Sequence, residues 1–206
     1  GEQIMTQKKV LAIDDEQIVL DSVRRILSEE NCTVDTTLNG REGIQWAAQR
    51  NYDLVLTDVR MPDLSGKIVL REIKRLKPTL PVVIVSGYAT VSSAIQCMRL
   101  GAAHVLEKPF TPEELSQVVQ SVLKQSAQAP PEEQGLIHDE EILKILDRAA
   151  REPAFARDLH TREAEALEEY NLTAAEKLAL VTGDVEWFEQ YIGTLEPKHK
   201  KLFETR

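Results

Sequence analysis

The chain has 206 residues, of which 42% are hydrophobic and 29% charged, a composition typical of a globular protein with room for one domain, or for one domain and a small second one. No apolar run approaches the length of about 18 residues that a membrane span needs, and the net charge of −9 disfavours a grip on duplex DNA. The opening stretch GEQIMTQKK lacks the apolar segment of a secretory signal, and only two cysteines are present, so we expect reduced thiols and a cytoplasmic location.

Short apolar or β-branched runs alternate with segments of helical periodicity through residues 8–125. The predicted strands are residues 8–13, 32–37, 53–57, 80–86 and 103–107, and the predicted helices are residues 16–30, 40–50, 65–76, 90–100 and 112–125. This alternation predicts an α/β fold, a doubly wound five-stranded parallel sheet with helices on both faces. The more polar strand 32–37 fits an edge of the sheet.

Polar side chains stand where four of these strands end. Asp14 and Asp15 follow the first strand, Asp58 the third and Lys108 the fifth, while Ser86 ends the fourth. Ligands of such sheets bind beyond the carboxyl ends of the strands, so we expect these side chains to lie together. Three carboxylates repel one another unless a cation joins them, and Mg²⁺ favours such oxygen ligands. The pattern therefore predicts a magnesium site beside a nucleophilic carboxylate, with an ammonium group ready to neutralise phosphate oxygens.

The motifs at these positions resemble those of the receiver domain of two-component response regulators. They read DDE at 14–16, TDVRMPDLSG at 57–66, VSGYAT at 85–90 and LEKPF at 106–110. The resemblance covers residues 8–125 and implies a receiver domain over 5–125 with the flavodoxin-like strand order 2-1-3-4-5. It also implies a phosphoacceptor signalling protein, not an enzyme that acts on outside substrates.

The resemblance further implies that Asp58 accepts a phosphoryl group from a sensor histidine kinase. Asp15 and Asp58 would bind Mg²⁺ directly, helped by the backbone carbonyl of Arg60, and Asp14 would act largely through water. Within the same stretch, Asp63, Ser65 and Gly66 are interpreted as loop and helix-start residues, the usual role of such residues between a strand and a helix.

The fourth and fifth strands carry the remaining implied roles. Lys108 would contact the phosphoryl group, Ser86 would donate a hydrogen bond to it, and the Lys108–Pro109 bond would be cis. Receiver domains usually have an aromatic residue three positions before the lysine, but Val105 stands there. Signal transfer through the face built by the fourth helix, fifth strand and fifth helix, which is also the face of a possible homodimer, is therefore expected to depart from its usual form.

Residues 126–135, SAQAPPEEQG, break the periodicity and are predicted to be a linker. Residues 136–206 have no strand-like run and are predicted to form an all-helical output or binding domain of about four or five helices. Thr173 and Glu176 form a capping-box pattern there. The stretch from REPAF through ALEEYNLTAAEKLALVTGD to YIGTL resembles the small helical domain of protocatechuate 4,5-dioxygenase α subunits, which implies a binding module for a protein or a small molecule.

Two alternative functions compete with this interpretation. A DNA-binding output is the commonest alternative, but residues 136–206 carry 16 acidic and 10 basic side chains and lack a basic recognition helix. A metal-dependent phosphatase would need an acid two residues after the nucleophile, where Arg60 stands. The aromatic residues Trp187, Phe188, Tyr191 and Phe203 are expected to be mainly core, and any left exposed would indicate a contact surface.

Overall fold

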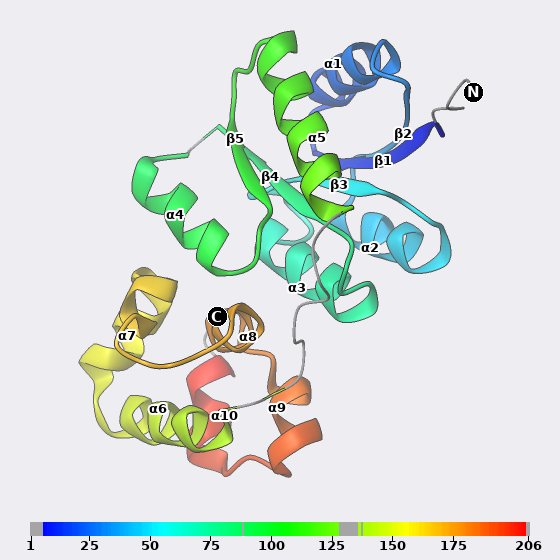
Figure 1. The fold of residues 1–206 in the computed structure, drawn as a ribbon. Coiled ribbons are helices and arrows are strands. Elements are labelled where there is room, and N and C mark those ends of the chain that lie inside the picture. Colours follow the sequence, from blue (N-terminus) through cyan, green and yellow to red (C-terminus); the bar gives the residue numbers. More distant parts are fainter. Residues whose placement is uncertain (1–5, 88, 128–135, 137, 205–206) are drawn as a thin grey trace. The chain divides into compact units, whose positions relative to one another are not determined.

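The computed structural model describes residues 6–87, 89–127, 136 and 138–204 (Figure 1). The chain divides into two compact units, the first built around a β-sheet and the second entirely from helices in its described residues. The predicted linker lies mostly outside the described residues, which omit 128–135.

The first unit contains a five-stranded parallel sheet with the strand order β2-β1-β3-β4-β5. The predicted order and the predicted edge position of the second strand are therefore confirmed. The strands are β1 (Lys8–Ile13), β2 (Cys32–Thr37), β3 (Leu54–Asp58), β4 (Val82–Ser86) and β5 (His104–Glu107), and the helices are α1 (Gln17–Ser28), α2 (Gly40–Gln49), α3 (Gly66–Leu76), α4 (Val91–Arg99) and α5 (Pro112–Ser126).

Helices cover both faces of this sheet, with α1 and α5 on one side and α2 and α3 on the other (Figure 1). Alternate residues of each strand face opposite layers. Val10 and Ala12 of β1 join the core shared with α1 and α5. Ile13 instead meets α2, where a Cβ on Gly43 would lie 2.3 Å from its Cδ1 atom, so this glycine lets the helix approach the sheet closely.

Two strand boundaries differ from the sequence prediction in a way that matters for the site. Strand β3 includes Asp58 as its last residue, so the carboxylate is fixed by the sheet itself and not by the following loop. Strand β4 begins at Val82, after Pro81, because proline has no N–H group to donate to a neighbouring strand. Both cysteines, Cys32 and Cys97, are buried.

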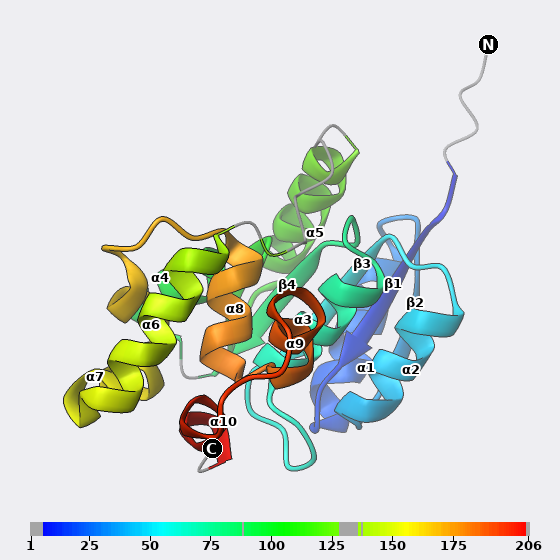
Figure 2. The same ribbon diagram turned by 90° about the horizontal axis from the view of Figure 1, so that it is seen from below.

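The second unit is helical throughout its described residues, as predicted (Figure 2). Its elements are α6 (Asp139–Arg151), α7 (Pro153–Thr161), the 3-10 helix η1 (Glu163–Leu167), α8 (Ala174–Thr182), α9 (Val185–Ile192) and α10 (Pro197–Glu204). The predicted capping box of Thr173 and Glu176 is confirmed at the start of α8. Trp187 and Phe188 are buried, and Phe203 is half-buried and stacks on Phe188. Of the four aromatic residues, Tyr191 is left exposed, at 48%.

Two clusters of polar side chains join separate elements of this unit. The fully buried Glu176 carboxylate accepts hydrogen bonds from the backbone N–H groups of His138 (2.7 Å) and Thr173 (2.8 Å), and it lies 2.9 Å from Nδ1 of His138. In the other cluster, Asp147 of α6 lies 2.8 Å from Nε2 of His199 and 2.9 Å from Nζ of Lys198, which joins α10 to α6.

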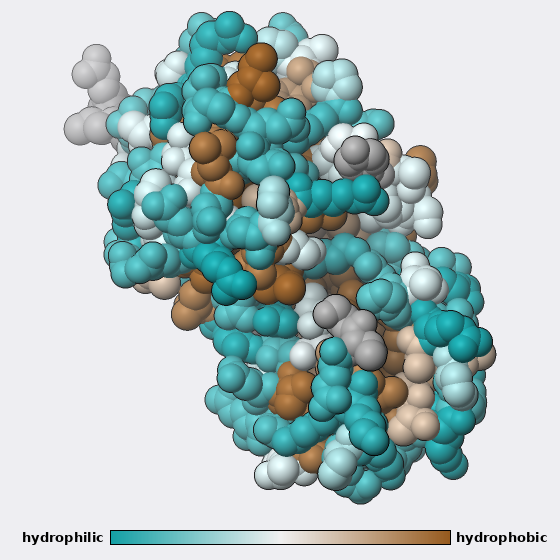
Figure 3. Space-filling view, turned by 180° about the vertical axis from the view of Figure 1, so that it is seen from behind, coloured by the Kyte–Doolittle hydropathy of each residue, from teal (hydrophilic) through white to brown (hydrophobic). Residues whose placement is uncertain are grey.

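The surface gives no sign of a membrane-spanning element within the described residues, since none of their helices is both long and apolar enough to cross a bilayer. On the face drawn in Figure 3, apolar side chains of the first unit lie in small areas separated by polar ones.

Candidate functional site

The polar residues predicted to meet at one edge of the sheet are delivered there by four parallel strands. Asp14 follows β1, Asp58 ends β3, Ser86 ends β4 and Lys108 follows β5. The strand register aligns these ends, because Asp58 is paired with Val85, the residue before Ser86. Asp14, Asp58 and Ser86 are buried, whereas Asp15 is exposed.

Lys108 lies at the centre of the site. Its Nζ atom is 2.6 Å from Oδ2 of Asp14, 3.3 Å from Oδ2 of Asp58 and 3.5 Å from Oε1 of Glu16. The predicted convergence of Asp14, Asp58 and Lys108 is therefore present in the structure. The sequence indicates Glu16 only as the last residue of the DDE motif, and its contact with Lys108 adds a fourth member to the cluster.

The pKa values of Asp14 and Lys108 reflect competition between burial and the neighbouring charges. Burial raises the pKa of Asp14, even though hydrogen bonds from Lys108 and from the backbone N–H of Glu16 oppose the shift. Burial also disfavours the ammonium of Lys108, but the hydrogen bond and charge of Asp14, together with Asp58, outweigh it and raise the pKa of Lys108. Lys108 therefore stays charged at neutral pH.

The donor set suits a hard divalent cation. Carboxylate oxygens of Asp14, Asp15 and Glu16 all lie within 4.8 Å of one another, and Asp58 joins Asp14 through their shared lysine. Oxygen ligands of this kind fit Mg²⁺, which commonly takes one or two carboxylates and keeps several waters.

The loop after β3 is shaped by its backbone. The N–H group of Arg60 lies 3.4 Å from Oδ1 of Asp58, and the N–H group of Gly66 donates to the carbonyl of Val59 at 2.8 Å. A Cβ on Gly66 would lie only 2.0 Å from the carbonyl oxygen of Asp58. Gly66 is the first residue of α3, as the sequence predicts, and the absence of a side chain also lets α3 approach the strand end that carries Asp58.

Strand β5, at the edge of the sheet beside β4, has no large aromatic side chain near the site. Val105 of β5 is half-buried and is paired with Ile84, two residues before Ser86. The Lys108–Pro109 peptide bond that follows this strand is cis, as expected.

A groove of about 560 Å³ opens directly beside Lys108. One wall comes from α1, with Ile18, Val19 and Ser22, and the other from Pro109 and Phe110. Ile18 is 73% exposed, which is unusual for a large apolar side chain next to a charged site.

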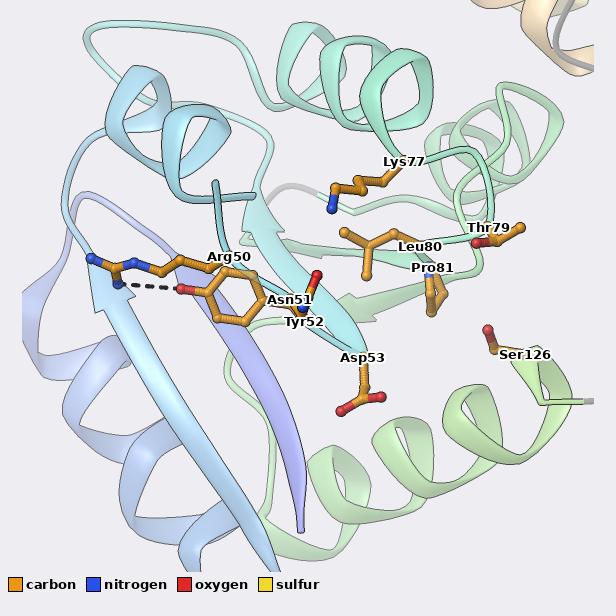
Figure 4. A pocket seen from close by; sticks show the side chains of 9 residues that line it. All are labelled: Arg50, Asn51, Tyr52, Asp53, Lys77, Thr79, Leu80, Pro81 and Ser126. Atoms are coloured by element: carbon orange, nitrogen blue, oxygen red, sulfur yellow. Dashed lines mark hydrogen bonds between the residues drawn. The ribbon is translucent and has the colours of Figure 1, made fainter. Parts of the chain in front are cut away.

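A second cavity, of about 240 Å³, lies at the other end of the strands, where β3 and β4 begin (Figure 4). Asp53, which precedes β3, lines it together with Lys77 and Tyr52. Tyr52 donates a hydrogen bond of 2.6 Å to Asp35 of β2, and the guanidinium of Arg50 lies 4.3 Å from the centre of the Trp46 ring. Two of the charged lining groups have partners outside the cavity, since Arg50 pairs with Asp35 at 3.3 Å and Asp53 with Lys8 at 4.0 Å. The cavity is separated from Asp58 by the length of β3.

Comparison with known proteins gives a consistent result for the first unit. The family model described as the response regulator receiver domain matches residues 10–120. The cell cycle response regulator CtrA of Brucella ovis is 33% identical over 118 residues, which are 57% of this chain and 51% of that protein. The chain thus spans about half the length of the curated relatives it matches.

Solved structures agree with this match. A response regulator receiver domain protein from Clostridium thermocellum superposes with a TM-score of 0.55 at 33% identity, covering 59% of this chain and 98% of that one. The beryllofluoride-activated NtrC4 receiver domain dimer superposes with a TM-score of 0.55 at 30% identity, covering 57% of this chain and 98% of that one.

Proposed function

Because the chain belongs to the response regulator receiver domain family, we propose that it is a two-component response regulator in which Asp58 accepts a phosphoryl group from a histidine kinase. The proposal is carried by one observation, the position of Asp58. Its carboxylate is buried at the end of β3, with Nζ of Lys108 3.3 Å from Oδ2. A carboxylate held in this way is a poised nucleophile with a counter-charge already in place.

Magnesium is the cofactor that fits this donor set. Asp15 and Asp58 would hold it with the backbone carbonyl of Arg60, and Asp14 would act largely through water. When bound, Mg²⁺ would neutralise oxygens of the phosphoryl group and of the carboxylates around it.

The chain's own residues account for the transfer step. A carboxylate oxygen of Asp58 forms a bond to phosphorus while the bond between phosphorus and the histidine nitrogen breaks. The electron pair of that bond stays on the imidazole, which then takes a proton. Lys108 neutralises the charge of the incoming group, and the Ser86 hydroxyl donates a hydrogen bond to it.

The groove along α1 supports a docking place for the kinase. Its apolar wall, which includes the 73% exposed Ile18, leads directly to Lys108. A kinase helix laid along this wall would bring its phosphohistidine to Asp58 while covering the exposed apolar surface.

The exposed apolar face of α4 supports a second proposed partner, another copy of this chain. Val91, Ile95 and Met98 are exposed on α4, and their spacing of four and three residues puts them on one helix face. The related NtrC4 receiver forms a dimer when activated with beryllofluoride, and we propose a similar phosphorylation-dependent dimer here.

The second unit is proposed to be a helical output module, cytoplasmic like the rest of the chain, that binds a protein or a small molecule. Its 16 acidic and 10 basic side chains over residues 136–206 support this function over the alternative of DNA binding. The alternative of a metal-dependent phosphatase acting on outside substrates is disfavoured because Arg60 stands where a second acid would be needed.

Incubation with Mg²⁺ and acetyl phosphate tests the central proposal. Intact mass spectrometry should detect one added phosphoryl group, and Asp58→Asn should remove the gain. Asp63→Asn, in the same loop, is the matched control and should still be labelled. Equal labelling of the Asp58→Asn variant would refute Asp58 as the acceptor.

A further inference from the structure

Lys108 has more carboxylate neighbours than phosphoryl chemistry requires. Its ammonium has three protons, and three carboxylates, those of Asp14, Asp58 and Glu16, surround it at 2.6, 3.3 and 3.5 Å. A phosphoryl oxygen on Asp58 that binds Lys108 must therefore displace one of these contacts.

The three carboxylates differ in how readily they can leave. The Asp14 side chain is 4% exposed and is also held by the N–H group of Glu16 at 2.9 Å, and Asp58 is the acceptor itself. The Glu16 side chain is 58% exposed, so water can solvate it as soon as it turns away. Glu16 also lines the groove beside Lys108, so it stands where a phosphoryl donor enters.

We propose that Glu16 is a positioning residue that acts through Lys108: it competes with the phosphoryl group on Asp58 for the ammonium and so limits how strongly the phosphorylated state is held. This inference rests on the proposed function of Asp58. In the unphosphorylated protein, Glu16 contacts the Lys108 ammonium at 3.5 Å. When the phosphoryl group is present, Glu16 competes with it for Lys108, and the negative charge of Glu16 opposes the anion.

Equilibrium binding of beryllofluoride, a phosphoryl mimic, at saturating Mg²⁺ measures this competition. Glu16→Gln should bind beryllofluoride about three- to tenfold more tightly than wild type, the effect of one partly exposed charge at short range. Glu29→Gln, an exposed carboxylate at the far end of α1, is the matched control and should bind as wild type does.

A double-mutant cycle tests whether Glu16 acts through Lys108. The rate of labelling by acetyl phosphate should rise in Glu16→Gln, but the same change should have little effect in a Lys108→Met background. In this reaction an Asp58 oxygen bonds to phosphorus while the bond from phosphorus to acetate breaks and leaves its electron pair on acetate. An equal rise in both backgrounds would mean that Glu16 acts by general repulsion, and it would overturn the proposal.

Calorimetric titration with Mg²⁺ alone separates competition from a ligand role. If Glu16→Gln weakens both Mg²⁺ and beryllofluoride binding, Glu16 serves the cation and the proposal is wrong. A wild-type protein that neither binds beryllofluoride nor is labelled would instead refute the proposed function of Asp58. A wild type that is labelled, with Glu16→Gln indistinguishable from it, refutes only the role of Glu16.

Discussion

Asp14 illustrates how a functional residue can work against the stability of its own fold. Its carboxylate is buried, and burial raises its pKa, which means that the folded state disfavours the charged form. Lys108 compensates only in part, because it is shared with Asp58 and Glu16.

Asp14→Asn should therefore stabilise the protein in the absence of divalent ions. We expect the free energy of unfolding to rise by about 0.5–2 kcal/mol, a typical gain when a functional site loses an unfavourable charge. Urea unfolding at neutral pH measures it, and calorimetric titration should detect weaker Mg²⁺ binding in the same variant. A loss of stability would mean that the contact with Lys108 outweighs the cost of burial.

Gly66 is the second residue whose identity is dictated by the site. Gly66→Ala would bring its Cβ to 2.0 Å from the Asp58 carbonyl oxygen and 2.8 Å from Cα of Val59, and neither backbone atom can move without moving the strand end. We expect a loss of about 1–3 kcal/mol in the free energy of unfolding, together with slower labelling of Asp58. Gly87→Ala is the control, since the added methyl group would meet no heavy atom closer than 4.0 Å. Equal stability of the two variants would contradict the close approach of α3.

At the scale of elements, β5 is where the sequence predicts a departure from the usual receiver pattern. Val105 offers a short, β-branched side chain where receiver domains usually carry a ring that changes position. We therefore expect movement of Ser86 toward a phosphoryl group to be coupled only weakly to α4 and α5.

Hydrogen exchange with and without beryllofluoride can measure this coupling. Protection should rise strongly in the loop after β3 and around Ser86, but only weakly in α4 and α5. Val105→Tyr should strengthen the response of the two helices. Strong and uniform protection of α4 and α5 in the wild type would demonstrate that coupling does not need the ring.

The junction of α6 and α10 is a second element-scale feature with a pH dependence. Hydrogen bonds from Lys198 and His199, in that order of importance, lower the pKa of Asp147 to about 2. Because the folded pKa lies below the usual value of about 3.9, the ionised carboxylate stabilises the fold above the unfolded pKa, and this contribution is lost as pH falls from about 4 toward 2.

Asp147→Asn should remove that part of the acid sensitivity of the second unit. In a Trp46→Phe background, Trp187 is the remaining tryptophan, so its emission reports unfolding of the unit that contains α6 and α10. The variant should be less stable than its parent near neutral pH, and the two should converge near pH 2. A constant difference across that range would contradict the assignment of the shift to Asp147.

How much of the fold and of the site the sequence predicts depends on how far apart along the chain the interacting residues lie. Strand periodicity and strand-end chemistry locate Asp14, Asp58 and Lys108, since parallel strands must deliver their ends to one edge. The capping box of Thr173 and Glu176 is local and is equally readable. The contact of Glu16 with Lys108 and the close approach at Gly66 join distant parts of the chain through one rotamer and one backbone distance, and no local pattern encodes either. The bonds from Glu176 to His138 are hidden for the same reason.

The whole molecule carries its charge unevenly, and this bears on its partners. Residues 1–125 have 15 basic and 16 acidic side chains and are close to neutral, so most of the net charge of −9 lies beyond them. A surface of this kind repels phosphates at long range.

Fluorescence anisotropy of the full chain with random duplex DNA at low salt should therefore detect no binding. The measurement should be repeated after loading with beryllofluoride, which tests whether phosphorylation exposes a binding surface. Micromolar binding that weakens steeply with salt would favour the DNA-binding alternative.

The hydrogen bond from His138 to Glu176 also affects how the second unit resists an applied force. The carboxylate grips the backbone just before α6 begins and belongs to the first turn of α8, a helix far along the sequence. A force applied to the chain at residue 138 would therefore act on α8 as well as on α6. The first turn of α6 would not unwind until the bond to Glu176 breaks. His138 is thus an anchored point at the start of the second unit, where α6 and α8 bear an applied force together.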